Sequence, residues 1–454
     1  MKRRLTKRLL KTTALFSGTE SLAMLCGIVR AKVVALAVGA SGVGMLGILS
    51  LVCEMAGSFV SSGLKTSGVR VIASASPGER ARTVHAVRHL ALISGLCAAA
   101  LVLLLSPLLS SVSFGFMALW PLFAFVAVAV IFNSVSGGES AVLQGSGRLR
   151  ALASASSLSA LFALVPACVI VWNLRNMWGV ALIVLVTSVV SALVFYAKGR
   201  RAVPEKYRKG EGSNYAYGPL LRMSAAMTLS GFLSVAAGYA VVSFIGFGGG
   251  LDSVGLYQAG YQMSVRYVGV IFSAMAMEYF PRISAQSSHP RRVELMMRHE
   301  CMVFLPLAAI GASAFIFLSP WLVRLFYDGS FLQVAPMLVC AAPSFVARVL
   351  SWNMAFVILA KGSPRQFMLT ESVGALIMAV SVMAGYSLWG LAGAGVGITL
   401  DSVLYCALVA VVNRRLFSIR ASSRVWIAAG LFFLLVAGVS LLSQGSWERS
   451  PHLP

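Results

Sequence analysis

Charged residues are scarce in this sequence, and acidic residues are the scarcest. Only 11% of the 454 residues are Asp, Glu, Lys or Arg, and just 14 are acidic. An ordinary soluble domain is about 25% charged and about 45–50% apolar. This chain is instead 58% hydrophobic, with a mean hydropathy of +0.85. The composition excludes a soluble globular domain and indicates a polytopic membrane protein.

Residue patterns for catalysis or metal binding are also missing. The seven cysteines all fall within apolar stretches and show no CxxC or Cys/His spacing, which argues against structural disulfides and against a metal site. The longest hydrophilic stretch, residues 197–218, is charged and glycine-rich and too short for a folded domain. We expect no catalytic residues, no cofactor and no metal. An embedded glycan polymerase or acyltransferase would need a catalytic loop that the sequence does not offer.

Apolar runs long enough to cross a membrane fill the rest of the chain. About 20 apolar residues span a hydrocarbon core as a helix, and unbroken runs such as "LALISGLCAAALVLLLSPLL" favour helices over barrel strands, in which polar and apolar residues would alternate. Thirteen helices are predicted, at about residues 12–38, 44–72, 84–110, 116–140, 151–172, 178–197, 218–241, 253–280, 299–320, 334–360, 368–387, 391–413 and 425–442.

The distribution of basic residues predicts the orientation. With the N-terminus in the cytoplasm, 30 of the 37 Lys and Arg residues lie in cytoplasmic segments or adjoining helix ends, and five lie outside. This bias follows the positive-inside rule. The net charge of +23 therefore reports membrane topology, and no nucleic-acid partner is implied. For residues 425–442 we favour a thirteenth span, with a periplasmic C-terminus, over an interfacial helix.

Two halves of the sequence resemble each other. Five landmarks recur in the same order at offsets of 211 to 217 residues, and the repeat predicts two six-helix halves, 1–210 and 211–416, followed by a tail, 417–454. Because each half has an even number of crossings, this is the parallel type of repeat found in transporters, with a binding site between the halves near the midplane. The alternative is a duplicated scaffold or channel without alternating access. The landmark pairs are Val43-Gly44 with Val254-Gly255, Arg70 with Arg282, Ser106-Pro107 with Ser319-Pro320, Arg148 with Arg365, and Trp178-Gly179 with Trp389-Gly390.

Three stretches carry a resemblance to a known family. They begin "GASGVGMLGILS", "VGLYQAGYQMSVRY" and "LAKGSPRQFMLTE", at positions 39, 254 and 359. They resemble the bacterial flippases for lipid-linked oligosaccharides, of the O-antigen and enterobacterial-common-antigen type, within the multidrug/oligosaccharidyl-lipid/polysaccharide exporter superfamily. The resemblance covers roughly residues 12–415. A thirteenth helix departs from the family's twelve.

This resemblance implies both a fold and a substrate. The fold is a V-shaped bundle of two six-helix halves around a central cavity that opens alternately to the two sides of the bacterial inner membrane. The substrate is an undecaprenyl-diphosphate carrier bearing one oligosaccharide repeat for surface polysaccharide. Expected partners are this lipid-linked oligosaccharide, membrane lipids and a polysaccharide polymerase complex. A drug/cation antiporter and a lipid II flippase of the same superfamily are the alternatives.

Four cations inside predicted spans are candidates for binding a diphosphate: Arg30, Lys32, Arg266 and Arg348. Arginine carries a permanent, planar charge that matches phosphate oxygens. "GIVR", which ends at Arg30, resembles a Gly-x-x-Arg stretch in the cavity of peptidoglycan-precursor flippases, so Arg30 is the first choice. The repeat position of Arg30, 211 residues on, is Val241. Lys32 is the better candidate for an anchor at the outer surface.

Carboxylates, aromatic rings and amides complete the set. Glu20, Glu54, Glu371 and Asp401 lie within predicted spans and are candidate charge partners or ion-coupling groups. Glu139, Glu278 and Glu300 lie near cytoplasmic helix ends. At the start of the helix predicted at 253–280, four residues are candidates for sugar contacts, although an interfacial aromatic belt explains them better. These four are Tyr257, Gln258, Tyr261 and Gln262.

Overall fold

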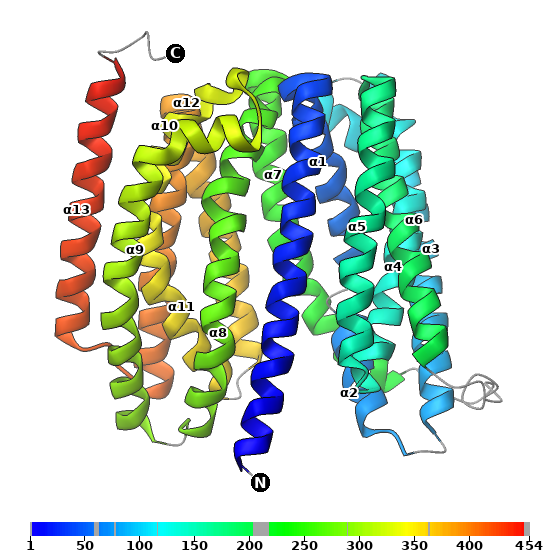
Figure 1. Cartoon of the computed structure of the whole chain (residues 1–454), viewed down its shortest axis with the longest axis horizontal. Coiled ribbons are helices and arrows are strands. Elements are labelled where there is room, and N and C mark those ends of the chain that lie inside the picture. Colours follow the sequence, from blue (N-terminus) through cyan, green and yellow to red (C-terminus); the bar gives the residue numbers. More distant parts are fainter. Residues whose placement is uncertain are drawn as a thin grey trace. The chain divides into compact units, whose positions relative to one another are not determined.

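The computed structural model is helical throughout the residues that it describes, and no strand occurs among them. The chain divides into two compact units, Met1–Gly255 and Leu256–Pro454 (Figure 1). The described residues are 2–58, 63–76, 79–115, 117–202, 218–287, 289–361 and 364–448.

Each unit is a set of long helices. The first contains α1 (Lys2–Ser58), α2 (Lys65–Ser74), α3 (Arg80–Phe114), α4 (Leu122–Gly145), α5 (Leu149–Leu174), α6 (Met177–Ala202) and α7 (Gly218–Tyr261) as far as Gly255. The second continues with a π-helix (Gln262–Arg266), α8 (Tyr267–Ala285), α9 (Pro290–Phe326), a 3-10 helix (Gly329–Val334), α10 (Ala335–Ala341), α11 (Ser344–Ala360), α12 (Pro364–Phe417) and α13 (Ser423–Glu448).

These helices have the length and composition of membrane spans. Among the described residues, nine helices are long and apolar enough to cross a bilayer, or ten if the bent pair Gly329–Ala341 and Ser344–Ala360 is one span. Three of the nine are interrupted by residues with non-helical backbone angles, in α1, α7 and α12. Large apolar side chains such as Leu104, Phe317 and Leu434 are exposed along them, as expected of surfaces that face lipid. The predicted all-α membrane fold is confirmed.

The interruptions in α1 and α7 occur at repeat-related glycines. Gly39 has φ 80° and ψ −162°, and Gly250 has φ 71° and ψ −177°. These two residues are 211 positions apart, the offset of the Val-Gly landmarks, and glycine adopts a positive φ without the steric cost that other residues incur. The same break at the same repeat position supports the internal repeat.

A second pair of repeat-related glycines lets two helices cross closely. A Cβ atom on Gly44 would collide with the carbonyl oxygen of Leu251, and one on Gly255 would collide with that of Ala40. Both pairs are again 211 residues apart, so the two contacts are related by the repeat. The first turns after the two breaks therefore pack backbone to backbone, which only small residues permit.

Several predicted helices differ from the observed ones. The helix predicted at 44–72 is observed as the end of α1 followed by α2, and the one predicted at 253–280 contains the π-helix. Two further differences have a clear physical reason. α9 begins at Pro290, nine residues before the predicted start at 299, because its first turns are basic and escape a search for apolar runs. The helix predicted at 334–360 is instead the bent pair α10 and α11, with an angle of 55° across a break that contains Pro343. Proline lacks an amide hydrogen and disrupts the preceding turn, which explains the bend.

Helix packing within each unit joins both consecutive and non-consecutive helices. In the first unit α4 packs against α3 and α6, and α5 packs against α1 and α6. In the second unit α11 packs against α8, α9 and α12, around buried residues that include Leu305, Val346 and Val409. The boundaries predicted from the repeat, 1–210, 211–416 and 417–454, divide the sequence differently from these two units and stay a prediction.

α13 runs lengthwise along the second unit (Figure 1). It packs against α9, and near its far end the Ser440 hydroxyl donates to the carbonyl oxygen of Val339 at 3.0 Å. Near its start, Trp426 lies beside Met297 in α9. An interfacial helix would lie across the ends of its neighbours, whereas α13 follows them from one end to the other, as a spanning helix does.

Candidate functional site

Arg30 lines a cavity of about 300 Å³ in the first unit. The walls come from α1, α5 and α6, and among the described residues that line it Arg30 is the one charged residue. Four hydroxyl groups share the wall with it: Ser156 and Ser159 from α5, and Thr187 and Ser191 from α6.

Helical spacing explains why these side chains converge. In α1 the lining residues are Ala23, Cys26, Gly27 and Arg30, which recur at the intervals of three and four that place residues on one helical face. The α5 residues between 156 and 164 and the α6 residues between 187 and 195 follow the same spacing. Small residues on α1 and α5 leave the space that Arg30 enters.

The hydroxyl groups on this wall are suited to accepting hydrogen bonds. Ser159 donates to the carbonyl oxygen of Ser156 at 2.9 Å, and Thr187 donates to that of Ile183 at 2.8 Å. Since a hydroxyl has one proton and two lone pairs, both oxygens can still accept from a ligand. The guanidinium of Arg30 has donors only. The cavity can therefore offer acceptors to sugar hydroxyls and a cationic donor to phosphate.

The other sequence-predicted charges of α1 lie elsewhere. Lys32 is half-buried and does not line the cavity, in keeping with the rotation of about 200° between residues two apart on a helix. Glu20 and Glu54 are exposed. Of the four predicted charges on α1, the structure places Arg30 alone in this cavity.

The second unit contains a polar cluster around Arg348. This half-buried arginine of α11 donates from Nε to the hydroxyl of Ser402 in α12 at 3.2 Å, and it interacts electrostatically with Asp401. Ser402 in turn donates to the carbonyl oxygen of Ile398 at 2.9 Å. The charge of Arg348 is thus compensated by a carboxylate on the neighbouring helix.

The cluster extends to three tyrosines and a second carboxylate. The Tyr405 hydroxyl donates to Glu371 Oε1, which joins two positions of α12 on either side of its break. The rings of Tyr257 and Tyr261 are in contact, tilted by 31° with centroids 5.8 Å apart, and both residues interact electrostatically with groups of the cluster. Four predicted residues, Tyr257, Tyr261, Arg348 and Asp401, therefore come together, with Glu371 connected through Tyr405. We call these six residues the Arg348 cluster.

The remaining predicted residues lie on the π-helix or beside it. Gln262 is half-buried and Arg266 is exposed, at the two ends of the π-helix Gln262–Arg266, and Gln258 is buried one turn earlier. π-Helical turns occur frequently at functional sites.

Sequence reasoning missed an ion pair in the first unit. Arg88 in α3 contacts Glu139 in α4, with Nε 2.7 Å from Oε1 and Nη2 donating to Oε2 at 2.9 Å. A side chain on Gly199 would occupy the position of this carboxylate, so α6 leaves room for the pair. Arg88 and Glu139 lie near the same membrane surface on consecutive antiparallel helices, a signal that could have predicted their contact. Near another pair of helix ends, Arg282 pairs with Glu300, with Nη1 3.1 Å from Oε1. The side chain of Glu278 lies outside the described residues.

Metal ligands do not gather in the described residues: no group of three or more His, Cys, Asp or Glu side chains is placed to hold an ion there. All seven cysteines are free. The polar chemistry of both units is that of arginine, carboxylate and hydroxyl groups.

A comparison with protein families decides the affiliation of the chain. The sequence model of a family described as polysaccharide biosynthesis protein matches residues 37–336, well over half of the chain. The chain belongs to this polysaccharide biosynthesis protein family. A search of curated proteins found no match.

Solved structures share the fold at low sequence identity. A multidrug resistance MATE family transporter of the MOP superfamily, inward-facing, matches with a TM-score of 0.71 at 15% identity, over 89% of this chain and 95% of that one. The lipid II flippase MurJ, in an inward closed conformation, matches with a TM-score of 0.72 at 11% identity, over 96% and 99%. A MOP superfamily transporter from Pyrococcus furiosus matches with a TM-score of 0.62 at 15% identity, over 90% and 95%. The family member described here therefore has the MOP transporter fold, as the sequence resemblance predicted.

Proposed function

We propose that this chain is a flippase that moves an undecaprenyl-diphosphate-linked oligosaccharide repeat unit from the cytoplasmic to the periplasmic leaflet of a bacterial inner membrane. The transported repeat would serve the synthesis of an O-antigen-like surface polysaccharide, together with a polymerase. The single observation that supports this proposal best is the cavity in which Arg30 is surrounded by hydroxyl groups.

The chemistry of the cavity fits both parts of this substrate. Charge-assisted hydrogen bonds from a guanidinium to phosphate are among the strongest in proteins. Hydroxyl oxygens of Ser159 and Thr187 supply acceptors for sugar hydroxyls. The proposal assigns diphosphate binding first to Arg30 and then to Arg266 as the substrate moves, with Lys32 as an outer anchor. Arg348, which sequence reasoning also named for the diphosphate, is assigned to the Arg348 cluster instead.

The Arg348 cluster is proposed to couple transport to an ion. It holds two carboxylates, Glu371 and Asp401, next to an arginine and three tyrosines within spans. Ionisable groups inside a membrane mark ion and proton pathways in transporters. Alternating access is supported by the matched MATE structures, which are described in inward-facing and outward-facing conformations. Sugar contacts are assigned to Tyr257, Gln258, Tyr261 and Gln262.

Lipid II transport is a second candidate, favoured by the extent of the match to the lipid II flippase. Lipid II presents the same chemistry of isoprenoid, diphosphate and sugar, so the Arg30 cavity does not separate the two substrates. Export of cationic drugs is less well supported, because Arg30, the one charged residue among the described residues that line this cavity, is itself a cation and would repel them.

Complementation tests the proposal. In a bacterial strain that lacks its own repeat-unit flippase, expression of this chain should restore surface polysaccharide, and Arg30→Ala should abolish the rescue at equal membrane abundance. Lys32→Ala is the matched control, since it removes a cation two residues away that does not line the cavity. Rescue of a strain depleted of its lipid II flippase, without rescue of surface polysaccharide, would replace the proposed substrate by lipid II. Drug resistance without either rescue would refute both.

A further inference from the structure

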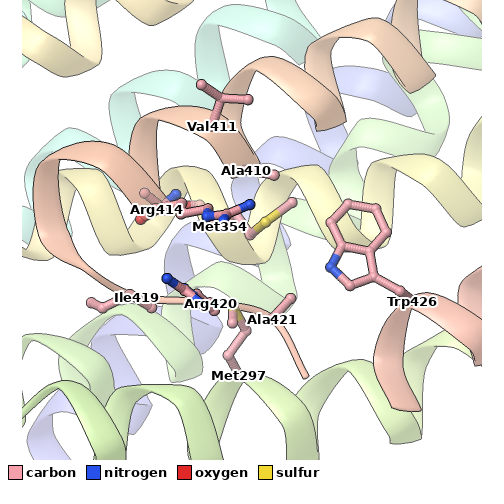
Figure 2. A pocket seen from close by; sticks show the side chains of 10 residues that line it. Met297, Met354, Ala410, Val411, Arg414, Ile419, Arg420, Ala421 and Trp426 are labelled. Atoms are coloured by element: carbon pink, nitrogen blue, oxygen red, sulfur yellow. The ribbon is translucent and has the colours of Figure 1, made fainter. Parts of the chain in front are cut away.

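A pocket of about 320 Å³ lies in the second unit where α12 ends and α13 begins (Figure 2). Its floor is apolar, made by the buried side chains of Met297, Met354 and Ile419. Figure 2 shows Arg414 and Arg420 one above the other at one side of the pocket, with Trp426 across from them. We call this space the α12–α13 pocket.

Two arginines give the α12–α13 pocket a positive wall. The side chains of Arg414 and Arg420 are exposed, one in the last turn of α12 and the other in the connection to α13. Glu294 is the acidic residue in contact with this connection, and it accepts a hydrogen bond from the backbone amide of Arg420 at 2.8 Å. It does not line the pocket, and no other acidic side chain lies among the described residues that line it with Arg414 and Arg420.

A buried polar residue lines the same pocket. Asn413 is 2% exposed, and its Nδ2 donates to the carbonyl oxygens of Met354 and Val409, each at 2.9 Å. Its Oδ1 is buried and accepts no hydrogen bond from the described residues. A buried acceptor without a donor is costly. A ligand in the α12–α13 pocket can supply that donor once a small movement of the Asn413 side chain brings Oδ1 to the pocket wall.

The position of the pocket suits a membrane lipid. The candidate spans 365–417 and 423–443 end and begin here, so the pocket lies at the level of the head groups. Tryptophan is enriched at that level. Val411 and Trp426, both exposed, leave an apolar exit toward the acyl region between α12 and α13.

We propose that the α12–α13 pocket binds the head group of phosphatidylglycerol, a phosphodiester with a free hydroxyl group. The phosphate lies between the guanidinium groups of Arg414 and Arg420, and a glycerol hydroxyl donates to Asn413 Oδ1. Basic pockets between spans recognise anionic lipid head groups in this way. The site holds a lipid of the surrounding membrane, and it is separate from the Arg30 cavity and from the transported substrate.

The same chemistry disfavours the other common head groups. Phosphatidylcholine carries no net charge and its trimethylammonium group has no hydrogen to donate. Phosphatidylethanolamine has a donor, but its ammonium group would lie beside two arginines. Phosphatidylmethanol has the charge of phosphatidylglycerol without the hydroxyl, and it therefore isolates the contribution of Asn413.

Native mass spectrometry of the purified full chain in detergent tests this proposal, with each lipid added in turn. The wild type should retain phosphatidylglycerol, and Arg414→Gln/Arg420→Gln should weaken its retention by about tenfold to thirtyfold, the effect expected for two surface arginines. Both side chains are exposed, so the folded state should survive, and the elution volume in size-exclusion chromatography checks it. The matched control is Arg200→Gln/Arg201→Gln, two exposed arginines in the last turn of α6. This control variant should retain phosphatidylglycerol as well as the wild type does.

Varying the added ligand distinguishes a lipid phosphate from a free phosphate. Phosphatidylmethanol should bind about fivefold more weakly than phosphatidylglycerol, for the loss of one neutral hydrogen bond. Inorganic phosphate and glycerol 1-phosphate at millimolar concentration should not displace the lipid. Equal retention of phosphatidylglycerol by the double variant, or equal retention of phosphatidylcholine by the wild type, would overturn the site. Displacement by inorganic phosphate would show an anion site without lipid specificity. Equal binding of phosphatidylmethanol and phosphatidylglycerol would show that Asn413 does not contact the head group.

Discussion

Arg30 and Arg348 are both arginines inside membrane spans, but their surroundings are opposite in kind. Arg30 lines an open cavity together with neutral hydroxyl groups. Arg348 donates to Ser402 and faces the carboxylate of Asp401 on the adjacent helix. A phosphate would compete with Asp401 at Arg348, whereas the described residues that line the Arg30 cavity offer hydroxyl groups and no carboxylate. We therefore assign diphosphate binding to the first region and structural or coupling roles to Arg348.

The repeat adds an internal control to this comparison. The position of Val241 corresponds to that of Arg30, and the Val241 side chain is completely buried. The two copies share their backbone break, at Gly39 and Gly250, and their close crossing, at Gly44 and Gly255. The helical framework therefore forms without a charge at this position in its second copy, and Arg30 is specific to the first copy.

The largest effect is expected for Arg30→Ala. Loss of the charge-assisted hydrogen bonds to a diphosphate should lower the transport rate by about 100-fold. The free energy of unfolding should change little, because Arg30 faces a cavity. The rate can be measured in proteoliposomes with a fluorescent lipid-linked oligosaccharide that is quenched from outside. Arg30→Lys should recover part of the transport rate. If Arg30→Ala lowers the midpoint of thermal unfolding in parallel with the rate, Arg30 has a structural role instead.

For Arg348 we expect the main effect on stability. Arg348→Ala leaves Asp401 without its compensating charge and should destabilise the protein, whereas the double variant Arg348→Ala/Asp401→Ala should be more stable than the single one. A double-mutant cycle on thermal unfolding should give a coupling free energy of about 1–3 kcal/mol. Additive effects of the two substitutions would show that the residues do not interact, and the contrast with Arg30 would then disappear.

Tyr405→Phe tests the outer part of the Arg348 cluster. It removes the hydroxyl that donates to Glu371 and leaves the ring in place. The expected cost is about 1–2 kcal/mol in the free energy of unfolding, since a half-buried carboxylate loses a hydrogen bond. Tyr386→Phe, on the same helix but about four turns from Glu371, is the control for the loss of a hydroxyl. Equal effects of both variants would exclude a specific role of the Tyr405 contact.

The smallest effect is expected for the hydroxyl groups around Arg30. Thr187→Val keeps the shape of the side chain and removes an acceptor, so transport should fall by about fivefold, the value of one neutral hydrogen bond. The change should appear in the KM for a glycosylated substrate and be absent for undecaprenyl diphosphate without sugars. If both substrates are affected equally, Thr187 does not contact sugar.

The fold could be predicted from the sequence because apolar runs report membrane spans directly. The gaps between the predicted helices, at 38–44 and 241–253, also contain the two glycine breaks, Gly39 and Gly250. The bend at Pro343 and the early start of α9 were missed, because hydropathy reports neither backbone geometry nor helical turns outside the apolar layer.

Individual site residues were predictable where a charge interrupts an apolar run. Arg30, Arg348, Glu371 and Asp401 stand out in this way. The hydroxyl groups of Ser156 and Thr187 could not be predicted, because serine and threonine occur throughout these spans and only helix packing places a few of them beside Arg30. Contacts between helices, such as Arg88 with Glu139, likewise depend on rotations about the helix axes that one sequence does not specify.

The affinity for undecaprenyl diphosphate tests the central claim most directly. Binding to the purified full chain can be measured by microscale thermophoresis for the wild type, Arg30→Gln and Arg348→Gln, with undecaprenyl monophosphate as the reference ligand. The account predicts that Arg30→Gln weakens diphosphate binding by at least about tenfold, the value of one hydrogen bond to a charged group, while Arg348→Gln leaves the Kd within about twofold. Equal Kd values for the wild type and Arg30→Gln, or a loss confined to Arg348→Gln, would contradict it.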